Sequence, residues 1–152
     1  MTVLLLQVFW QDVKTRTLNL AVLAVIVCLV IGSRLISVSI VQYAIDVCLN
    51  LLWIGTHLLV LTAYLSVRRK AFTVPVGAFM GLGDVAFWLA PALFFAPEKF
   101  VFFWIASTVF ALAAHGCLRV ALKKTYMSTI PLAGFQALWM AATLVTIAPS
   151  VR

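Results

Sequence analysis

Charged residues are scarce in this chain, and their scarcity excludes several classes of protein. Of its 152 residues only 10% are charged, with Asp and Glu contributing 4, and 65% are hydrophobic. A typical soluble domain is nearer half apolar and a quarter charged. The composition therefore excludes an ordinary water-soluble enzyme, a disordered chain and a nucleic-acid binder, even though the formal net charge is +7. The length fits one domain, so we expect residues 1–152 to form a single polytopic membrane domain.

The sequence also offers few groups that bind metals or form disulfides. Its cysteines, Cys28, Cys48 and Cys117, are isolated within apolar segments, and no CxxC pair occurs. Neither His57 nor His115 has a second histidine or a carboxylate three or four residues away. We therefore expect no disulfide framework, no metal site and no cofactor. For each histidine we expect a neutral side chain that is hydrogen-bonded between helices, with a proton relay as the alternative.

Long apolar runs fill most of the chain. A helix needs about 20 residues to cross a bilayer. Apolar segments occur at residues 1–13, 18–33, 36–67, 72–97, 100–122 and 130–149. The third is too long for one span, so we expect a loop or interfacial segment there before a helix over 47–67. Proline and glycines in the fourth disfavour a continuous helix, so we expect a loop or re-entrant segment over 71–82 and a helix over 83–97.

The basic residues fall between these segments and indicate the topology. Alternate connections hold 8 basic residues on one side and 3 on the other. The richer side of a membrane protein is the cytoplasmic one. The pattern predicts an all-α integral membrane protein with six transmembrane helices and both termini outside. A lipid bilayer is then the surrounding partner, and no nucleic-acid partner is expected.

Aspartates near the ends of these segments need an explanation, because ionisable groups are costly in or near a bilayer. Asp12 ends the first segment and Asp84 opens the fourth, and both adjoin connections assigned to the cytoplasm. Two carboxylates at similar depth fit general acid–base work on a water, with one protonated while the other is ionised. The alternative is that both cap helices at the interface. Asp46 lies at the opposite side, where we expect a solvated helix-end residue.

Two glycines come just before Asp84. Gly81 and Gly83 frame Leu82, and a glycine lets the backbone approach a second chain closely or adopt positive φ. Such a backbone suits a site where a peptide substrate lies extended beside a carboxylate. Gly81 and Gly83 are therefore candidate substrate-binding residues.

Three segments, in the same order, resemble motifs of the type IV prepilin leader peptidases, a family of membrane aspartic proteases with a GxGD motif. Residues 12–19 are similar to the family's Asp, basic linker and Ile-Pro-Asn. Residues 81–85 are similar to its Gly-x-Gly-Asp-Val. Residues 123–124 and 129–135 are similar to its basic loop and the Ile-Pro-Phe-x-Pro that opens the last helix. The resemblance covers nearly the whole chain and includes the expected six helices.

The resemblance implies an aspartic endopeptidase, a hydrolase, at the cytoplasmic face of a bacterial inner membrane. The family removes the short basic leader from prepilin-like precursors of type IV pili and secretion systems. Asp12 and Asp84 would be its catalytic pair, with no metal or other cofactor. Larger members carry an N-terminal domain with two CxxC pairs, tied to methylation, so this chain resembles the short form that lacks the methyltransferase.

Two other interpretations stay open. Leu18 and Ala86 stand where the family usually has Pro and Lys, and Leu132 and Gly134 depart from its last motif. These departures motivate a catalytically degenerate membrane scaffold or assembly protein of the same fold. A small transporter that uses the two aspartates for proton coupling is disfavoured, because transport sites usually lie near the midplane of the bilayer.

Overall fold

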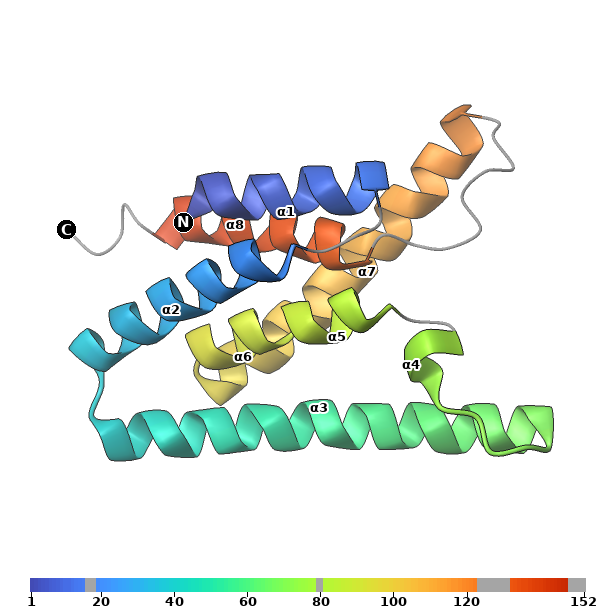
Figure 1. The fold of residues 1–152 in the computed structure, drawn as a ribbon, viewed down its shortest axis with the longest axis horizontal. Helices are drawn as coiled ribbons and strands as arrows, with labels where there is room; N and C mark the ends of the chain where they lie inside the picture. Colours follow the sequence, from blue (N-terminus) through green and yellow to red (C-terminus); the bar gives the residue numbers. More distant parts are fainter. Residues whose placement is uncertain (16–18, 79–80, 123–131, 148–152) are drawn as a thin grey trace. The chain divides into compact units, whose positions relative to one another are not determined.

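The computed structural model describes residues 1–15, 19–78, 81–122 and 132–147, which are helical with short connections and contain no strand (Figure 1). The all-α class predicted from the sequence is confirmed for these residues. The helices are α1 (Thr2–Thr15), α2 (Leu20–Ser37), α3 (Ile40–Arg69), α4 (Pro75–Ala78), α5 (Leu82–Phe87), α6 (Leu89–Phe94), α7 (Pro97–Leu122) and α8 (Leu132–Ile147). The chain divides into two compact units, Met1–Leu29 with Val101–Arg152, and Val30–Phe100.

Among the described residues, three helices are long and apolar enough to cross a membrane: α2, α3 and the Pro97–Cys117 part of α7. Shorter apolar helical stretches occupy Leu82–Phe94 and Leu132–Val145. Their length and composition suggest a membrane protein. The topology of six spans stays a prediction.

Helix α3 begins earlier than the sequence suggested. The expected break before this helix is present, as a short connection at residues 38–39, but the helix start expected near residue 47 is wrong, because α3 begins at Ile40 and runs to Arg69. Ser39 is its N-cap, and the Ser39 hydroxyl accepts a hydrogen bond from the backbone N–H of Gln42 at 3.3 Å. Of the polar residues before residue 47, Ser39 therefore caps α3, and Gln42 and Asp46 lie within the helix.

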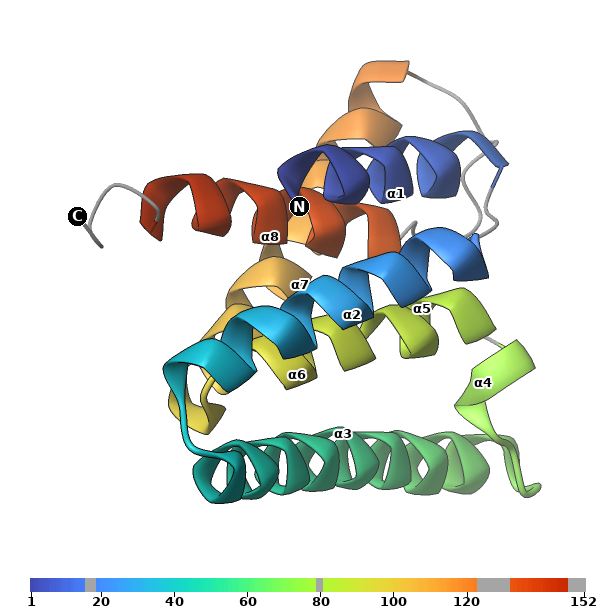
Figure 2. The ribbon, with the colours of Figure 1, turned by 60° about the vertical axis from the view of Figure 1, so that its left-hand side comes forward.

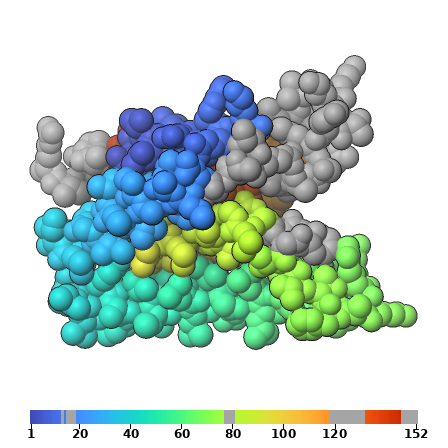
Figure 3. Space-filling view, in the orientation of Figure 1, coloured from blue at the N-terminus to red at the C-terminus, as the bar shows by residue number. Residues whose placement is uncertain are grey.

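Only a narrow stripe of α3 is buried. Its buried residues are Asp46, Asn50 and Ile54, which are spaced four apart and so share one face. Large apolar side chains such as Leu52, Leu59 and Val67 are exposed. Figure 3 shows the side chains of α3 lying open at the surface from its start to its end. Polar residues inside and apolar residues outside are the arrangement expected of a helix whose outer face meets lipid.

The fourth apolar segment folds as short helices rather than as one. The loop expected over 71–82 contains the short helix α4, and the helix expected over 83–97 is divided into α5 and α6 at Trp88. Pro91 explains the division, since it has no N–H to donate to the carbonyl of Phe87 four residues earlier. Pro97, a favourable first residue for a helix, opens α7.

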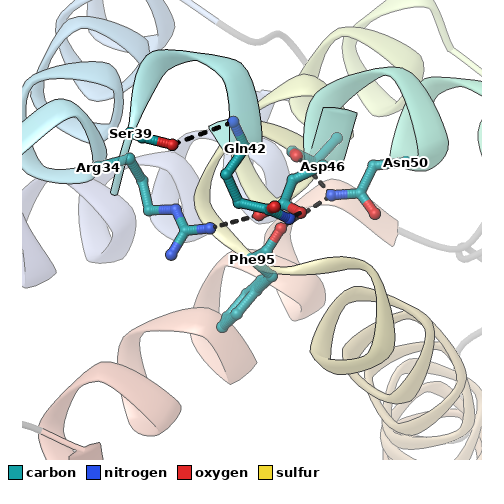
Figure 4. A network of polar contacts seen from close by, with 7 residues as sticks. Arg34, Ser39, Gln42, Asp46, Asn50 and Phe95 are labelled. Carbon is teal, nitrogen blue, oxygen red and sulfur yellow. Dashed lines mark hydrogen bonds and ion pairs between the residues drawn. The ribbon is translucent and has the colours of Figure 1, made fainter. Parts of the chain in front are cut away.

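A side chain from α3 satisfies the end of α6. The Nδ2 atom of Asn50 donates hydrogen bonds to the backbone carbonyl oxygens of Ala92 and Phe95, each at 2.8 Å (Figure 4). Asn50 is 1% exposed. Carbonyl groups at the end of a helix lack partners within that helix, so these bonds join α6 to α3 and satisfy a helix end at once.

In the first unit, α1 lies antiparallel to α8 (Figure 1 and Figure 2). Helix α8 buries small residues at intervals of four, Ala133, Ala137 and Ala141, and α1 buries Leu5 and Val8. Small residues with this spacing let two helix backbones approach closely in a membrane. Helix α7 adds Phe110, whose ring lies 6.2 Å from Phe135 and 5.2 Å from Trp139 of α8, centroid to centroid.

We predict that Asn50→Leu destabilises the protein, because the end of α6 loses its amide donor while the volume of the side chain is kept. The expected loss in the free energy of unfolding is about 1–3 kcal/mol. The measurement is reversible unfolding of the purified protein in mixed micelles. Thr56→Val is the matched control, since exposed Thr56 donates only to Leu52 of its own helix. Equal stability of Asn50→Leu and wild type would contradict the prediction.

Candidate functional site

Asp12 lies against the first turn of α8. Its Oδ2 atom accepts a hydrogen bond from the backbone N–H of Gly134 at 2.6 Å, and Asp12 is 9% exposed. Such a short bond is typical of a charged acceptor. Gly134 is the third residue of α8, so its N–H belongs to the amide groups that find no acceptor in their own helix. Asp12 therefore caps α8 from the neighbouring helix α1.

Gly134 leaves little room beside Asp12. A Cβ atom added at Gly134 would lie 2.9 Å from Asp12 Oδ2 and 3.2 Å from Asp12 Cβ. It would also lie 3.4 Å from the backbone carbonyl oxygen of Phe9. The first of these distances is shorter than real side chains show. A larger residue at this position therefore has to displace the Asp12 carboxylate.

Asp84 lies in the first turn of α5. The backbone N–H of Gly81 donates a hydrogen bond to Asp84 Oδ2 at 3.2 Å, and the N–H of Asp84 donates to the Gly81 carbonyl at 3.1 Å. A carboxylate that reaches back to the N-cap N–H forms one half of a capping box. Asp84 is half-buried. It thus has the first-turn position that the capping interpretation expects.

The two glycines before Asp84 differ in their surroundings. Gly81 is exposed and has extended backbone, with φ −70° and ψ 148°, so it does not need positive φ. A Cβ atom added at Gly81 would lie 3.5 Å from Asp84 Oδ2 and 3.9 Å from Gly83 N, which are ordinary contacts. Gly83 is half-buried within α5. Neither the backbone conformation nor the space around residue 81 therefore requires a glycine there.

Both predicted catalytic residues are held in the same way. In each case an Oδ2 atom accepts a hydrogen bond from a backbone N–H at the start of a helix: Gly134 of α8 for Asp12, and Gly81 before α5 for Asp84. The positive end of the helix dipole favours a negative charge at this position. Asp12 and Gly134 belong to the first unit, and Asp84 and Gly81 belong to the second. Each carboxylate is therefore held by an amide of its own unit.

The expectation of a solvated Asp46 is wrong. Asp46 is 5% exposed, and its Oδ2 atom accepts a hydrogen bond from Arg34 Nη2 at 2.9 Å (Figure 4). Its Oδ1 atom accepts a hydrogen bond from Gln42 Nε2, also at 2.9 Å. Arg34 lies in the last turn of α2, and the short connection to α3 brings it opposite Asp46. Burial of the carboxylate is offset by the charge of the partly buried Arg34 beside it.

Neither histidine lies in a ligand cluster. The ring of His57 on α3 meets the ring of Trp88 edge-on, with 6.2 Å between the centroids. His115 on α7 has a buried Nδ1 atom with no hydrogen-bond partner among the described residues. In that same part of the chain, no group of three His, Cys, Asp or Glu residues could hold a metal ion.

No family model matches this chain, and neither a curated protein nor a solved structure matches it.

Three contributions to these sites were not predicted from the sequence. They are the Gly134 amide that holds Asp12, the Arg34 partner of Asp46 and the Asn50 amide at the end of α6. The four-residue spacing of Gln42, Asp46 and Asn50 is a signal for the second and third, since it marks one polar face on an otherwise apolar helix. The contact of the Gly134 amide with Asp12 has a weaker signal in the sequence, which is a glycine in the first turn of an apolar helix.

We predict that Arg34→Leu or Asp46→Leu alone destabilises the protein, because each leaves one buried charge without its partner. Breaking a fully buried pair costs about 3–5 kcal/mol. We expect less in this protein, since the Arg34 side chain is 19% exposed. The double variant should recover most of the loss, and unfolding in mixed micelles of all three variants measures the coupling. A double variant as unstable as the sum of the single variants would contradict the prediction.

Proposed function

We propose that this chain is an aspartic endopeptidase of the type IV prepilin leader peptidase kind. Its substrate is a prepilin-like precursor in which a short basic leader precedes an apolar helix. Cleavage takes place at the cytoplasmic face of a bacterial inner membrane. The topology that goes with this proposal has six spans and both termini outside.

One observation carries the proposal. Asp12 and Asp84, the two residues matched to the family's catalytic pair, each have one carboxylate oxygen held by a backbone amide at the start of a helix. A bond to one oxygen limits rotation of the carboxylate and fixes its orientation. Groups held in one orientation are what catalysis on a water requires.

The chemistry needs the two carboxyl groups to meet at one water. The ionised group takes a proton from this water as the water oxygen attacks the scissile carbonyl carbon. The protonated group gives its proton to the carbonyl oxygen, which yields a gem-diol. The gem-diol then returns a proton to the second carboxylate as the C–N bond breaks, and the first carboxyl protonates the leaving amine. This mechanism requires the two carboxyl groups to share one proton between them.

The second candidate function is a non-catalytic membrane scaffold. The same capping geometry favours it, because a carboxylate that satisfies a helix start has a structural role without any catalysis. Ala86 adds to this, since it stands in α5 at the position where the resembled family usually has Lys. The two candidates differ in what they require of the carboxyl group. Capping needs only an acceptor, whereas hydrolysis needs a group that gives and takes a proton.

We predict that Asp12→Asn and Asp84→Asn each abolish cleavage of the precursor while the folded protein persists. An amide oxygen can still accept the bond from the helix start, but it cannot act as a general acid or base. The assay co-expresses each variant with a precursor in membranes and follows loss of the leader by gel shift. Unfolding in micelles checks that the Asn variants keep a stability close to that of wild type.

Glu98→Gln is the matched control for this experiment. Glu98 is also a first-turn carboxylate, in α7, but it is exposed and lies outside the proposed pair. Cleavage at the wild-type rate by either Asn variant would exclude the proposed peptidase. An intact precursor with the wild type, on several precursors, would favour the scaffold.

We predict that Gly81→Ala raises the KM for the precursor about 10-fold, because the added methyl group occupies the face that the extended substrate approaches. Folding should be unchanged, since the new Cβ atom makes only ordinary contacts, the nearest at 3.5 Å. The measurement is cleavage rate against precursor concentration in proteoliposomes. Gly55→Ala, with nothing within 4 Å of its added Cβ, is the control. An unchanged KM would remove Gly81 from the substrate site.

A further inference from the structure

Gly134 meets Asp12 in two separate ways. Its backbone N–H donates to Asp12 Oδ2 at 2.6 Å, and its missing side chain leaves the space in which that oxygen lies. The first feature attracts the carboxylate to one place. The second makes that place available. Together they allow Oδ2 to lie directly against the backbone of α8, at a position that a side chain at residue 134 would obstruct.

Three atoms of α1 lie close to the space that a side chain at residue 134 would fill. A Cβ atom at Gly134 would meet Oδ2 at 2.9 Å, and Asp12 Cβ and the Phe9 carbonyl oxygen lie next, at 3.2 Å and 3.4 Å. The second and third of these belong to the α1 backbone and its first side-chain atom, which move only if α1 moves. The carboxylate must therefore rotate to relieve the shortest contact when residue 134 gains a side chain, and a small shift between α1 and α8 relieves the other two.

We infer that Gly134 is a positioning residue for Asp12: its amide and its lack of a side chain together set the orientation of the Asp12 carboxyl group. This inference rests on the proposed peptidase function. Within it, Oδ2 is the oxygen of the catalytic carboxyl group that α8 holds. Gly134 itself touches neither the water nor the substrate.

The inference predicts a particular order among variants of residue 134. Gly134→Ala keeps the N–H and adds a Cβ atom. Gly134→Pro adds a Cβ atom and also removes the N–H, and a proline is tolerated in the first turn of a helix. A displacement of about 1 Å at a reacting group can cost about 100-fold in rate. We expect kcat to fall about 10-fold for the Ala variant and about 100-fold for the Pro variant, with KM within about twofold of wild type in both.

The control is Gly116→Ala, a glycine of the same unit with nothing within 4 Å of its added Cβ. Rates are expressed per folded molecule in proteoliposomes, so that a purely structural effect lowers the folded fraction but not kcat. Unchanged kcat in folded Gly134→Ala and Gly134→Pro, beside an active wild type, would overturn the positioning role alone. A wild type that cleaves no precursor would overturn the proposed function, and the positioning role with it.

A spectroscopic measurement covers the case in which the residue 134 variants do not fold. The chain has 7 glycines, so glycine-selective ¹⁵N labelling gives a small set of amide resonances. A short bond to a carboxylate shifts the Gly134 amide proton downfield. That resonance should move upfield in Asp12→Asn and stay in place in Asp84→Asn. A spectrum in which no glycine amide responds to Asp12→Asn would overturn the inference without any assay of cleavage.

Discussion

Helix ends in this chain need partners for their N–H and C=O groups in surroundings that are almost wholly apolar, and this need explains where the polar residues lie. Asn50 donates to the end of α6, Asp12 accepts from the start of α8, and Asp84 accepts from the residue that begins α5. Ser39 does the same for α3. With only 10% of residues charged, few polar side chains remain for other tasks.

Capping and catalysis are compatible at Asp12 and Asp84. A carboxyl group has two oxygens, and a helix start requires only one of them. Holding one oxygen in place removes a rotation that the reaction would otherwise have to freeze. The pair of Arg34 and Asp46 is of another kind, because Asp46 accepts hydrogen bonds from two side chains, Arg34 and Gln42, rather than from the start of a helix.

The apolar runs predicted the first and last helices, α1 and α8, well, since a polar or basic residue ends each run. The first expected segment, 1–13, is α1 from Thr2 to Thr15, and the last, 130–149, is α8 from Leu132 to Ile147. The helices in the middle of the chain were predicted less well. The polar residues before residue 47 belong to α3 rather than preceding it, and Pro91 divides the helix expected over 83–97. At the site, the capping alternative for Asp84 was accessible from local sequence, whereas the contact of Asp12 joins helices at opposite ends of the chain.

That last contact has a consequence for how the protein is made. The bond from Gly134 to Asp12 closes a separation of 122 residues, so its acceptor is synthesised with the first helix and its donor with the last. Until α8 is present, water or another polar group must replace the Gly134 amide as a hydrogen-bond partner of the Asp12 carboxylate. The first helix thus reaches its final environment only after α8 has been synthesised, and a product truncated before α8 would lack the amide that holds Asp12 Oδ2.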